Sequence, residues 1–490
     1  MKKYIIRVIC FICIFMLLLL GVQSVLHYRW TEDDSLFDKY IDYADSMQDS
    51  VDVLYFGTSE LWYGIDPLLI FHEEGITGYN FACRWRSAQT VYYQLLYALK
   101  CHKPKVVACD FACLFQNYTP QVLEQIYRKT ADTMPDWKIK NALIKDICRM
   151  DAEQDLLSWY FPVFRYHDMW AGLTESNFKK DYRYHEDYRK HTKGAAFITG
   201  DYNGTIGSIH PDLWDARPQE AALAEGSVEY YDKFIEECQS RGIKVLAVMP
   251  PKISEAGSYT ALWEQKRKYL VSRGVDYLNY NTYEQVQRMG AELDADYLED
   301  SHMNLSGSMK LSRVLAADLK EKYAFEDKRR DGRYFEEWTK HWPAFQQEAV
   351  SRQDRLDKYT DAIKQTECSC IIAVRTNDAL LAGEGLGDLY TAGTGSIDGS
   401  CIVYCEKGEI SGQLLNGLYS GSVHSERLGE LKIRTDSGEF HASRTDEGIE
   451  INMENREMPE GKCAFYWFAV FGDNGEIIHS SEWSVQNDAV

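Results

Sequence analysis

Short apolar runs alternate with amphipathic segments from residue 51 to residue 323, and this alternation restricts the chain to few folds. Short apolar runs are typical of buried strands, and the amphipathic segments between them are typical of helices. Strands separated by helices form a parallel sheet with helices on both faces. We therefore expect an α/β protein whose main unit is a three-layer α/β/α sandwich. The expected strands are residues 51–57, 76–82, 105–111, 243–251 and 275–281, and the expected helices are residues 66–75, 87–102, 228–242, 259–274 and 306–323.

The length of 490 residues exceeds what one ordinary hydrophobic core supports, so several domains are expected. We expect the sandwich to span residues 50–323 and to be interrupted by a helical insertion at about 116–225. An insertion after the carboxyl end of a strand overhangs the ligand crevice, so this one is a candidate lid. A charged helical connector is expected at 324–365, followed by a β-rich domain at 366–490 with glycine-rich turns.

Three basic residues precede an almost uninterrupted apolar run at about residues 8–25. Roughly 18 apolar residues are enough to cross a bilayer. Residues 1–30 are therefore expected to be a single-pass membrane anchor, with a cytoplasmic N-terminus and the bulk of the chain outside the cytoplasm. A cleaved signal peptide is the alternative, since Val22 and Ser24 suit the small-residue positions of a cleavage site.

Charge and cysteine usage exclude several functions. The formal net charge is −21, and basic residues form no long cluster beyond the N-terminus, so nucleic acid is not an expected partner. Of the 13 cysteines, neither the pair Cys368 and Cys370 nor the pair Cys401 and Cys405 forms a CxxC motif, and no histidine accompanies them at zinc-ligand spacing. We therefore expect no metal and no cofactor, and we expect most of the cysteines to be buried thiols.

Ser59 follows Gly57 and Thr58 at the end of the first expected strand. A serine at this place has two interpretations. Its hydroxyl can cap the following helix, or it can act as a nucleophile at the sheet edge where open α/β sheets bind ligands. The sequence around Ser59 alone does not separate the two.

His302 lies in the stretch DYLEDSHMNLSG at residues 296–307, just before the last expected helix. In a parallel sheet this loop lies at the same edge as Ser59. A histidine flanked by carboxylates can accept the proton of a serine while an acid holds its tautomer. The alternative is a helix-capping loop in which His302 only packs. The two-point match at both ends of one domain favours the catalytic interpretation.

Three short blocks carry a resemblance to a known family: FGTSE at residues 56–60, YNFA at 79–82 and EDSHMNLSG at 299–307. The pattern resembles the SGNH (GDSL-like) hydrolase superfamily, in particular its membrane-anchored branch that includes the lipoteichoic-acid D-alanylation protein and the alginate O-acetylation proteins. The resemblance implies a flavodoxin-like SGNH fold, with Ser59 as nucleophile and His302 as base. It also implies an oxyanion hole made by the amides of Ser59 and Ala82.

The chain departs from the family pattern at three points. Glu299 stands where the family usually has aspartate, and Asp300 follows it, so either carboxylate can orient the imidazole. Ala82 stands where glycine is usual. The asparagine of the third family block has no clear counterpart, because Asp110 ends the third strand and Asn117 lies further along.

The remaining pocket candidates are Asn80 in the second block and Arg165 and His167 in the insertion, although the aromatic-rich stretch around the last two is also typical of simple helix packing. The resemblance implies an extracytoplasmic serine esterase or O-acyltransferase that acts on cell-envelope polysaccharide through an acyl-serine. Its expected partners are an envelope glycopolymer or acyl donor and a membrane-bound O-acyltransferase. The alternative is a catalytically degenerate SGNH-like envelope protein that binds glycan or a protein partner.

Overall fold

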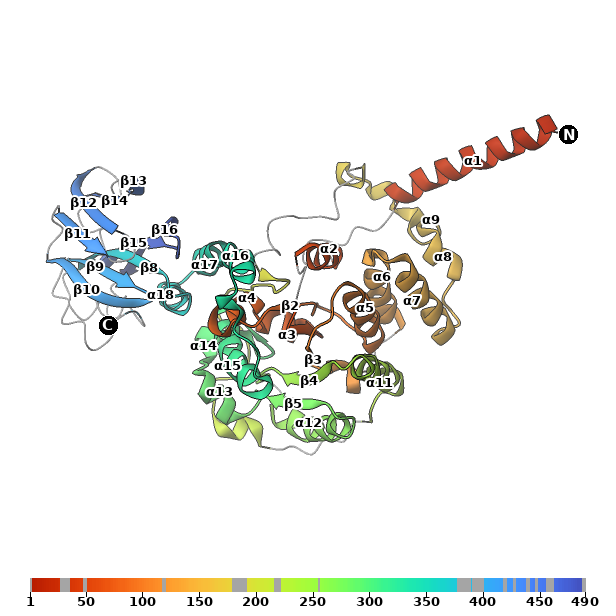
Figure 1. The fold of residues 1–490 in the computed structure, drawn as a ribbon, viewed down its shortest axis with the longest axis horizontal. Helices are drawn as coiled ribbons and strands as arrows, with labels where there is room; N and C mark the ends of the chain where they lie inside the picture. The colour runs from red at the N-terminus through yellow and green to blue at the C-terminus, as the bar shows by residue number, and fades with distance from the viewer. Residues whose placement is uncertain are drawn as a thin grey trace.

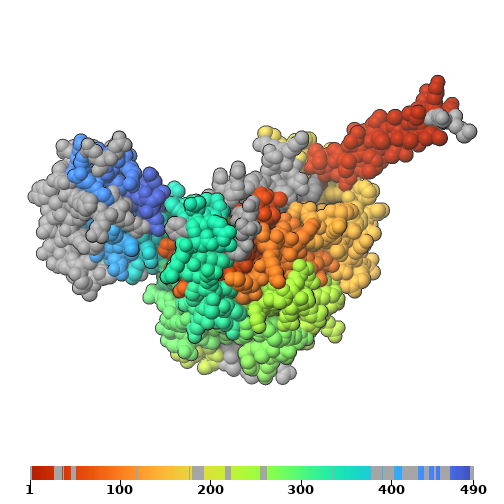
Figure 2. Space-filling model, in the orientation of Figure 1, coloured from red at the N-terminus to blue at the C-terminus, as the bar shows by residue number. Residues whose placement is uncertain are grey.

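The computed structural model contains an N-terminal apolar helix, a mixed α/β region and a C-terminal β region (Figure 1). Figure 2 shows the N-terminal helix α1 (Lys2–Val25) projecting from the rest of the molecule. The described residues are 2–26, 36–46, 51–116, 120–178, 192–215, 222–253, 256–376, 389, 401–416, 421–425, 429–437, 441–445, 448–454 and 462–486.

The α/β region is built on a five-stranded sheet with the order β2-β1-β3-β4-β5. Every neighbouring pair in it is parallel, which confirms the predicted parallel sheet. This order is one of the two common doubly wound arrangements, in which ligands bind beyond the carboxyl ends of the strands. The strands are β1 (Val53–Phe56), β2 (Gly78–Asn80), β3 (Val106–Cys109), β4 (Lys244–Met249) and β5 (Asp276–Asn279).

Helices cover both faces of this sheet, because strands buried on both sides need apolar cover (Figure 1). On one face α4 (Pro67–Glu74) packs against α15 (Leu305–Tyr323). On the other face α5 (Ala88–Cys101) packs against α11 (Glu225–Ser240), and α12 (Ala256–Val271) lies beside β5. The predicted alternation of strands and helices is thus present in space.

The insertion consists mainly of short helices that lie beside α5 and beside the end of α1 (Figure 1). Helix α2 (Phe37–Ser46) also packs on the sandwich, where the ring of Tyr43 meets that of Phe81 with 4.7 Å between the ring centroids. The α-helices in the described part of the insertion include α6 (Pro120–Thr133), α7 (Trp137–Met150), α8 (Leu156–Tyr160) and α9 (Pro162–Tyr166).

Three helices connect the sandwich to the C-terminal region: α16 (Gly332–Thr339), α17 (Trp342–Ser351) and α18 (Leu356–Gln365). Figure 1 shows them between the two regions. The ring of Tyr359, on α18, packs against that of Phe468 with 5.2 Å between the ring centroids. The Tyr359 hydroxyl is hydrogen-bonded to His479 Nδ1 at 2.9 Å. The connector is therefore packed against the C-terminal strands.

The C-terminal region contains two sheets, with the orders β10-β9-β8-β15-β16 and β11-β12-β14-β13. Their pairs are antiparallel except for β12 with β14, which is parallel. Apolar side chains such as Ile371, Trp467 and Ile451 form a core between the sheets. The strands are β8 (Ser369–Thr376), β9 (Cys401–Glu406), β10 (Glu409–Asn416), β11 (Gly421–Ser425), β12 (Gly429–Ser437), β13 (His441–Thr445), β14 (Gly448–Glu454), β15 (Lys462–Phe471) and β16 (Ile477–Gln486).

Helix α1 is long and apolar enough to cross a membrane. Its apolar side chains from Tyr4 to Leu18 are exposed, as expected of a segment that the rest of the chain does not cover. Length and composition fit a membrane span and fit a signal sequence equally well.

Candidate active site

The turn after β1 places Ser59 at the start of a short helix, α3 (Ser59–Gly64). Gly57 has φ of +140°, a conformation that favours glycine, and a Cβ there would lie 2.4 Å from an oxygen of Asp110. That oxygen accepts hydrogen bonds from both the amide and the hydroxyl of Thr58, each at 2.7 Å. The Asp110 carboxylate therefore holds the turn that presents Ser59.

His302 lies on a short antiparallel hairpin rather than on the loop that the sequence predicts. Its strands are β6 (Tyr297–Glu299) and β7 (His302–Met303), and Glu299 is the partner of His302 across the pair. Side chains of directly opposed residues lie on the same face and close together. The end of the insertion braces this hairpin, because the amide of Asn203 donates to Leu298 at 3.0 Å.

The structure brings Ser59, His302 and Glu299 into one hydrogen-bonded line. Ser59 Oγ lies 2.8 Å from His302 Nε2. On the other side of the ring, His302 Nδ1 is hydrogen-bonded to Glu299 Oε1. This is the order of nucleophile, base and orienting acid that serine catalysis requires.

Asp300, the other candidate acid, is turned to a different part of the molecule. Its carboxylate accepts hydrogen bonds from the hydroxyl of Tyr202 and, at 3.2 Å, from that of Thr205. Asp300 thereby ties the end of the insertion to the hairpin. The geometry pairs Glu299, and not Asp300, with the imidazole.

Glu299 is held in its ionised form. The hydrogen bond from His302 lowers the pKa of this carboxyl below its ordinary value, and Ser301 contributes a further hydrogen bond at 2.9 Å. The Glu299 side chain is 46% exposed and that of His302 is 22% exposed. The triad is thus reachable from solvent, and an ionised acid stabilises the imidazolium that forms when His302 takes a proton.

The second block does not present a free amide as the resemblance implies. The amide of Ala82 donates to Asn80 Oδ1 at 3.0 Å. Asn80 is fully buried and its Nδ2 donates to the carbonyls of Leu61 and Ile65, each at 2.9 Å. Asn80 therefore holds α3 in place through these two hydrogen bonds, and its buried side chain is not accessible to a ligand. The amide of Ser59, at the first position of α3, remains as an oxyanion donor, because the first amides of a helix lack intrahelical acceptors.

Arg165 and His167 lie apart from the triad. Arg165 Nε donates to Glu124 at 2.8 Å, and His167 Nδ1 is within 3.3 Å of the carbonyl of Phe164. Figure 1 places α9, which ends just before His167, beside α1 and away from α3. The structure does not bring this candidate pair to Ser59. Asn117, the distant candidate for the third block, lies outside the described residues.

Side chains that the sequence patterns did not single out surround the triad. The ring of Tyr63 meets that of His302 edge to face at 5.6 Å, and the Arg84 guanidinium is hydrogen-bonded to the hydroxyl of Tyr63. Next to the nucleophile, Glu60 pairs with Lys252 at 3.1 Å. Tyr63 and Glu60 follow Ser59 on α3. Their short distance from Ser59 along the chain was the only sequence signal that could have marked them as neighbours of the site.

Below the turn lies a buried cation. Lys266 Nζ is 3.2 Å from the carbonyl oxygen of Asp110, and burial lowers the pKa of this lysine. Burial also raises the pKa of the Asp110 carboxyl, with a further contribution from the negative charge of Glu60. The two groups lie in one buried environment below Ser59, and burial is the largest influence on the pKa of each.

Within the part of the chain that the structure describes, histidine, cysteine, aspartate and glutamate form no group of three or more that could hold a metal ion. Comparison of the sequence with models of known protein families and with curated proteins finds no match. The site itself holds a serine hydroxyl, a histidine within hydrogen-bonding distance of it and an ionised carboxylate on the other side of the imidazole.

Proposed function

We propose that the protein is a serine esterase or O-acyltransferase that works through an acyl-serine intermediate. The observation that carries the proposal is the alignment of Ser59, His302 and Glu299, with Ser59 Oγ 2.8 Å from His302 Nε2. Nucleophile, base and orienter within hydrogen-bonding reach of one another are the signature of nucleophilic catalysis. The doubly wound strand order supports a place in the SGNH superfamily, whose blocks the sequence resembles.

The reaction follows from these positions. Ser59 Oγ bonds to the carbonyl carbon of an ester while His302 Nε2 takes the proton of the Ser59 hydroxyl. The negative charge that develops on the carbonyl oxygen faces the amide of Ser59. Collapse of the tetrahedral intermediate breaks the bond to the leaving alcohol, which receives the proton from His302. Water then releases the acyl group as an acid, or a second hydroxyl accepts it as a new ester.

The acceptor that we propose is a hydroxyl of a cell-envelope polysaccharide. Helix α1 is apolar and long enough to cross a membrane, which supports an ectodomain held at the membrane surface. The resemblance to the membrane-anchored SGNH branch supports the same substrate class. In this arrangement a membrane-bound O-acyltransferase is the natural partner that supplies acyl groups.

One observation favours a second function, that of a non-catalytic glycan-binding protein. The amide of Ala82 donates to Asn80 at 3.0 Å, so one expected oxyanion donor is occupied. Loss of one such donor costs about a hundredfold or more in rate. A chain with this feature could retain the triad and yet turn over no substrate.

Active-site labelling separates the two functions. The full chain in lipid nanodiscs is treated with a serine-directed fluorophosphonate and, separately, with an activated acetyl ester. We expect a covalent adduct on the peptide that contains Ser59 and slow ester hydrolysis, both absent in Ser59→Ala. That substitution opens almost no cavity, so equal thermal unfolding of the two proteins is the control. Folded wild-type protein that neither labels nor hydrolyses would favour the glycan-binding function.

A further inference from the structure

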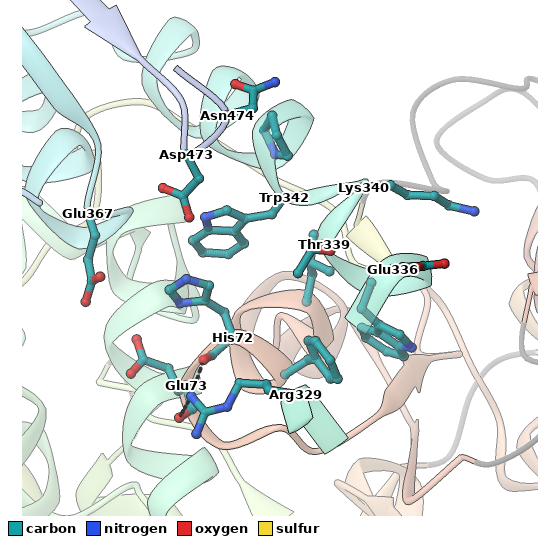
Figure 3. A pocket seen from close by; sticks show the side chains of 14 residues that line it. His72, Glu73, Arg329, Glu336, Thr339, Lys340, Trp342, Glu367, Asp473 and Asn474 are labelled. Atoms are coloured by element: carbon teal, nitrogen blue, oxygen red, sulfur yellow. Dashed lines mark hydrogen bonds between the residues drawn. The ribbon is translucent and has the colours of Figure 1, made fainter. Parts of the chain in front are cut away.

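A pocket of about 780 Å³ lies where the sandwich meets the C-terminal β region (Figure 3). It is lined by the end of α4, the connector and the turn between β15 and β16. Helix α4 runs back from the carboxyl edge of the sheet, where Ser59 lies, toward the start of β2. The pocket is therefore at the opposite edge of the sheet from the triad. Its volume is within the range of small-molecule sites.

The two regions that form the pocket are pinned together. The buried side chain of Gln346, on α17, donates to Asp473 Oδ1 at 3.2 Å and accepts from the Asp473 amide at 3.1 Å. The Gln346 Nε2 also donates to the carbonyl of Thr366 at 2.9 Å. These bonds fix the β15–β16 turn on the connector, so the pocket exists before any ligand binds.

An indole N–H in the wall has no acceptor among the described residues. Trp342 is 3% exposed, and its Nε1 is buried without a hydrogen-bond partner. A buried donor without an acceptor costs roughly 1–3 kcal/mol, which a ligand oxygen would recover. Figure 3 shows the nitrogen edge of the indole turned to the side of the pocket where Asp473 lies.

His72 lies against Trp342 and adds a neutral polar group. Its ring stacks on the indole at 3.9 Å with an interplanar angle of 6°. Burial lowers the pKa of this imidazole, so it is uncharged near neutral pH. A neutral imidazole offers one donor and one acceptor.

Glu336 and Lys340 also line the pocket, away from the His72–Trp342 stack, and Lys340 pairs with Glu337. The charged groups nearer the stack form two sets. Arg329 is bonded to Asp327 and to the carbonyls of His72 and Glu73, and Glu73 is paired with Arg313 at 2.8 Å. The charges of Arg329 and Glu73 are therefore paired within the protein. The carboxylates of Glu367 and Asp473 lie on the indole side of the pocket (Figure 3). Asp473 Oδ1 already accepts a hydrogen bond from Gln346, but a carboxylate can accept several hydrogen bonds and so can also accept one from a ligand.

We propose that this pocket binds a saccharide unit as a second, non-catalytic site. A sugar hydroxyl accepts from the Trp342 N–H and donates to a carboxylate such as that of Asp473, and neighbouring hydroxyls do the same with His72 and Glu367. An amine would leave the indole donor unpaired. The inference does not depend on the chemistry of Ser59, because the site lies at the other edge of the sheet.

Calorimetric titration of the full chain, in lipid nanodiscs free of glycolipid, tests this site. The probes are maltotriose, cellotriose, chitotriose and mannotriose, with tetramethylammonium as the cationic comparison. We expect saturable binding of at least one trisaccharide and none of tetramethylammonium. The indole ¹H–¹⁵N resonance of Trp342, identified by its loss in Trp342→Phe, should shift as that trisaccharide binds.

Two variants locate the binding, and two serve as controls. Trp342→Phe keeps the ring stack and removes the donor, and Asp473→Asn removes the charge, so each should weaken binding roughly two- to tenfold. Glu336→Gln is the matched control: Glu336 also lines the pocket, but Figure 3 shows its side chain directed away from the His72–Trp342 stack, so the affinity of this variant should equal that of the wild type. Ser59→Ala should also bind normally, so a failure of the enzyme proposal leaves this result intact.

Three outcomes would overturn the proposal. They are the absence of binding by all four trisaccharides, binding of tetramethylammonium in their place, and unchanged affinity in both Trp342→Phe and Asp473→Asn.

Discussion

The two edges of the parallel sheet differ in whether their buried polar groups are hydrogen-bonded within the protein. At the carboxyl edge, Ser59, His302 and Glu299 are hydrogen-bonded to one another in a line. At the amino edge, the Trp342 N–H is buried without an acceptor among the described residues. A triad needs its members paired before substrate arrives, because their alignment is the catalytic device. A binding pocket instead keeps donors for the ligand.

Helix α4 links the two edges. Asp66 caps its first turn by accepting hydrogen bonds from Leu68 at 3.1 Å and Leu69 at 3.3 Å, close to the turn that follows α3. Its last turn carries His72 into the pocket wall. Substitutions at one edge should therefore leave the other unaffected unless they act through α4.

The largest effect is expected from removing the base. His302→Ala leaves Ser59 without a proton acceptor, so the rate of fluorophosphonate labelling should fall roughly a thousandfold or more. Time-resolved labelling of the full chain measures this rate. Trisaccharide binding at the amino edge should stay at the wild-type level. A labelling rate within tenfold of wild type would mean that another group activates Ser59.

The next largest effect is expected from replacing the carboxylate that is hydrogen-bonded to His302. Glu299→Gln replaces the ionised orienter by an amide that can hold the wrong tautomer of His302, so ester turnover should fall about a hundredfold or more. Asp300→Asn should lower it only a few fold, because Asp300 bonds to Tyr202 and Thr205 instead. Steady-state kinetics on an activated acetyl ester compare the two. Equal losses in both variants would contradict the pairing in the structure.

A smaller effect is expected from the turn below the nucleophile. Gly57→Ala forces a side chain into φ of +140° and within 2.4 Å of Asp110, which should lower the free energy of unfolding by about 1–3 kcal/mol. Chemical denaturation measures this change. The displaced turn should also slow labelling at Ser59, while pocket binding persists. Unchanged stability together with unchanged labelling would show that the turn tolerates a side chain.

The last effect is expected at Asp66, as a change of stability with pH. Burial raises the pKa of Asp66 from 3.8 to about 8, so the folded chain holds a proton that the unfolded chain loses over this range. The contribution of this group to stability therefore falls as pH rises from about 4 to about 8. Asn caps a helix about as well as Asp but does not titrate.

Asp66→Asn should accordingly gain stability relative to wild type as pH rises through this window. Thermal unfolding at several pH values, with both proteins in the same buffers, measures the difference. Parallel curves would indicate that Asp66 is ionised in the fold. Trisaccharide affinity of Asp66→Asn, measured at one pH, then tests whether the cap of α4 influences the pocket at its other end.

Much of the carboxyl edge follows from local patterns. Apolar runs of strand length separated by amphipathic segments predict a parallel sheet, and parallel strands place the ends of their chains at one edge. That argument alone brings Ser59 and His302 to the same edge. The choice between Glu299 and Asp300 does not follow, because it depends on a two-stranded hairpin and on Tyr202, 98 residues away from Asp300.

The structure leaves the other predicted site residues outside the line of Ser59, His302 and Glu299, for a related reason. Asn80 and Ala82 match a family block in sequence, but their hydrogen bonds to each other and to α3 leave neither available to a ligand. Arg165 and His167 lie on an insertion that the sequence predicts as helical, but the pattern does not say which side of the sandwich the insertion packs against. No local signal in the chain marks the pocket at the amino edge, since its walls come from four segments far apart in the sequence.

The sequence by itself determined the parallel α/β region, the β-rich C-terminal region, the apolar N-terminal helix and the two residues most suited to exchange a proton. These features depend on periodicity, chain direction and residue type, which act over a few residues at a time. The tertiary structure decided which carboxylate meets the imidazole, which amides are occupied and where a second pocket opens. Those outcomes depend on hydrogen bonds and packing between distant segments, and such contacts exist only after the chain has folded.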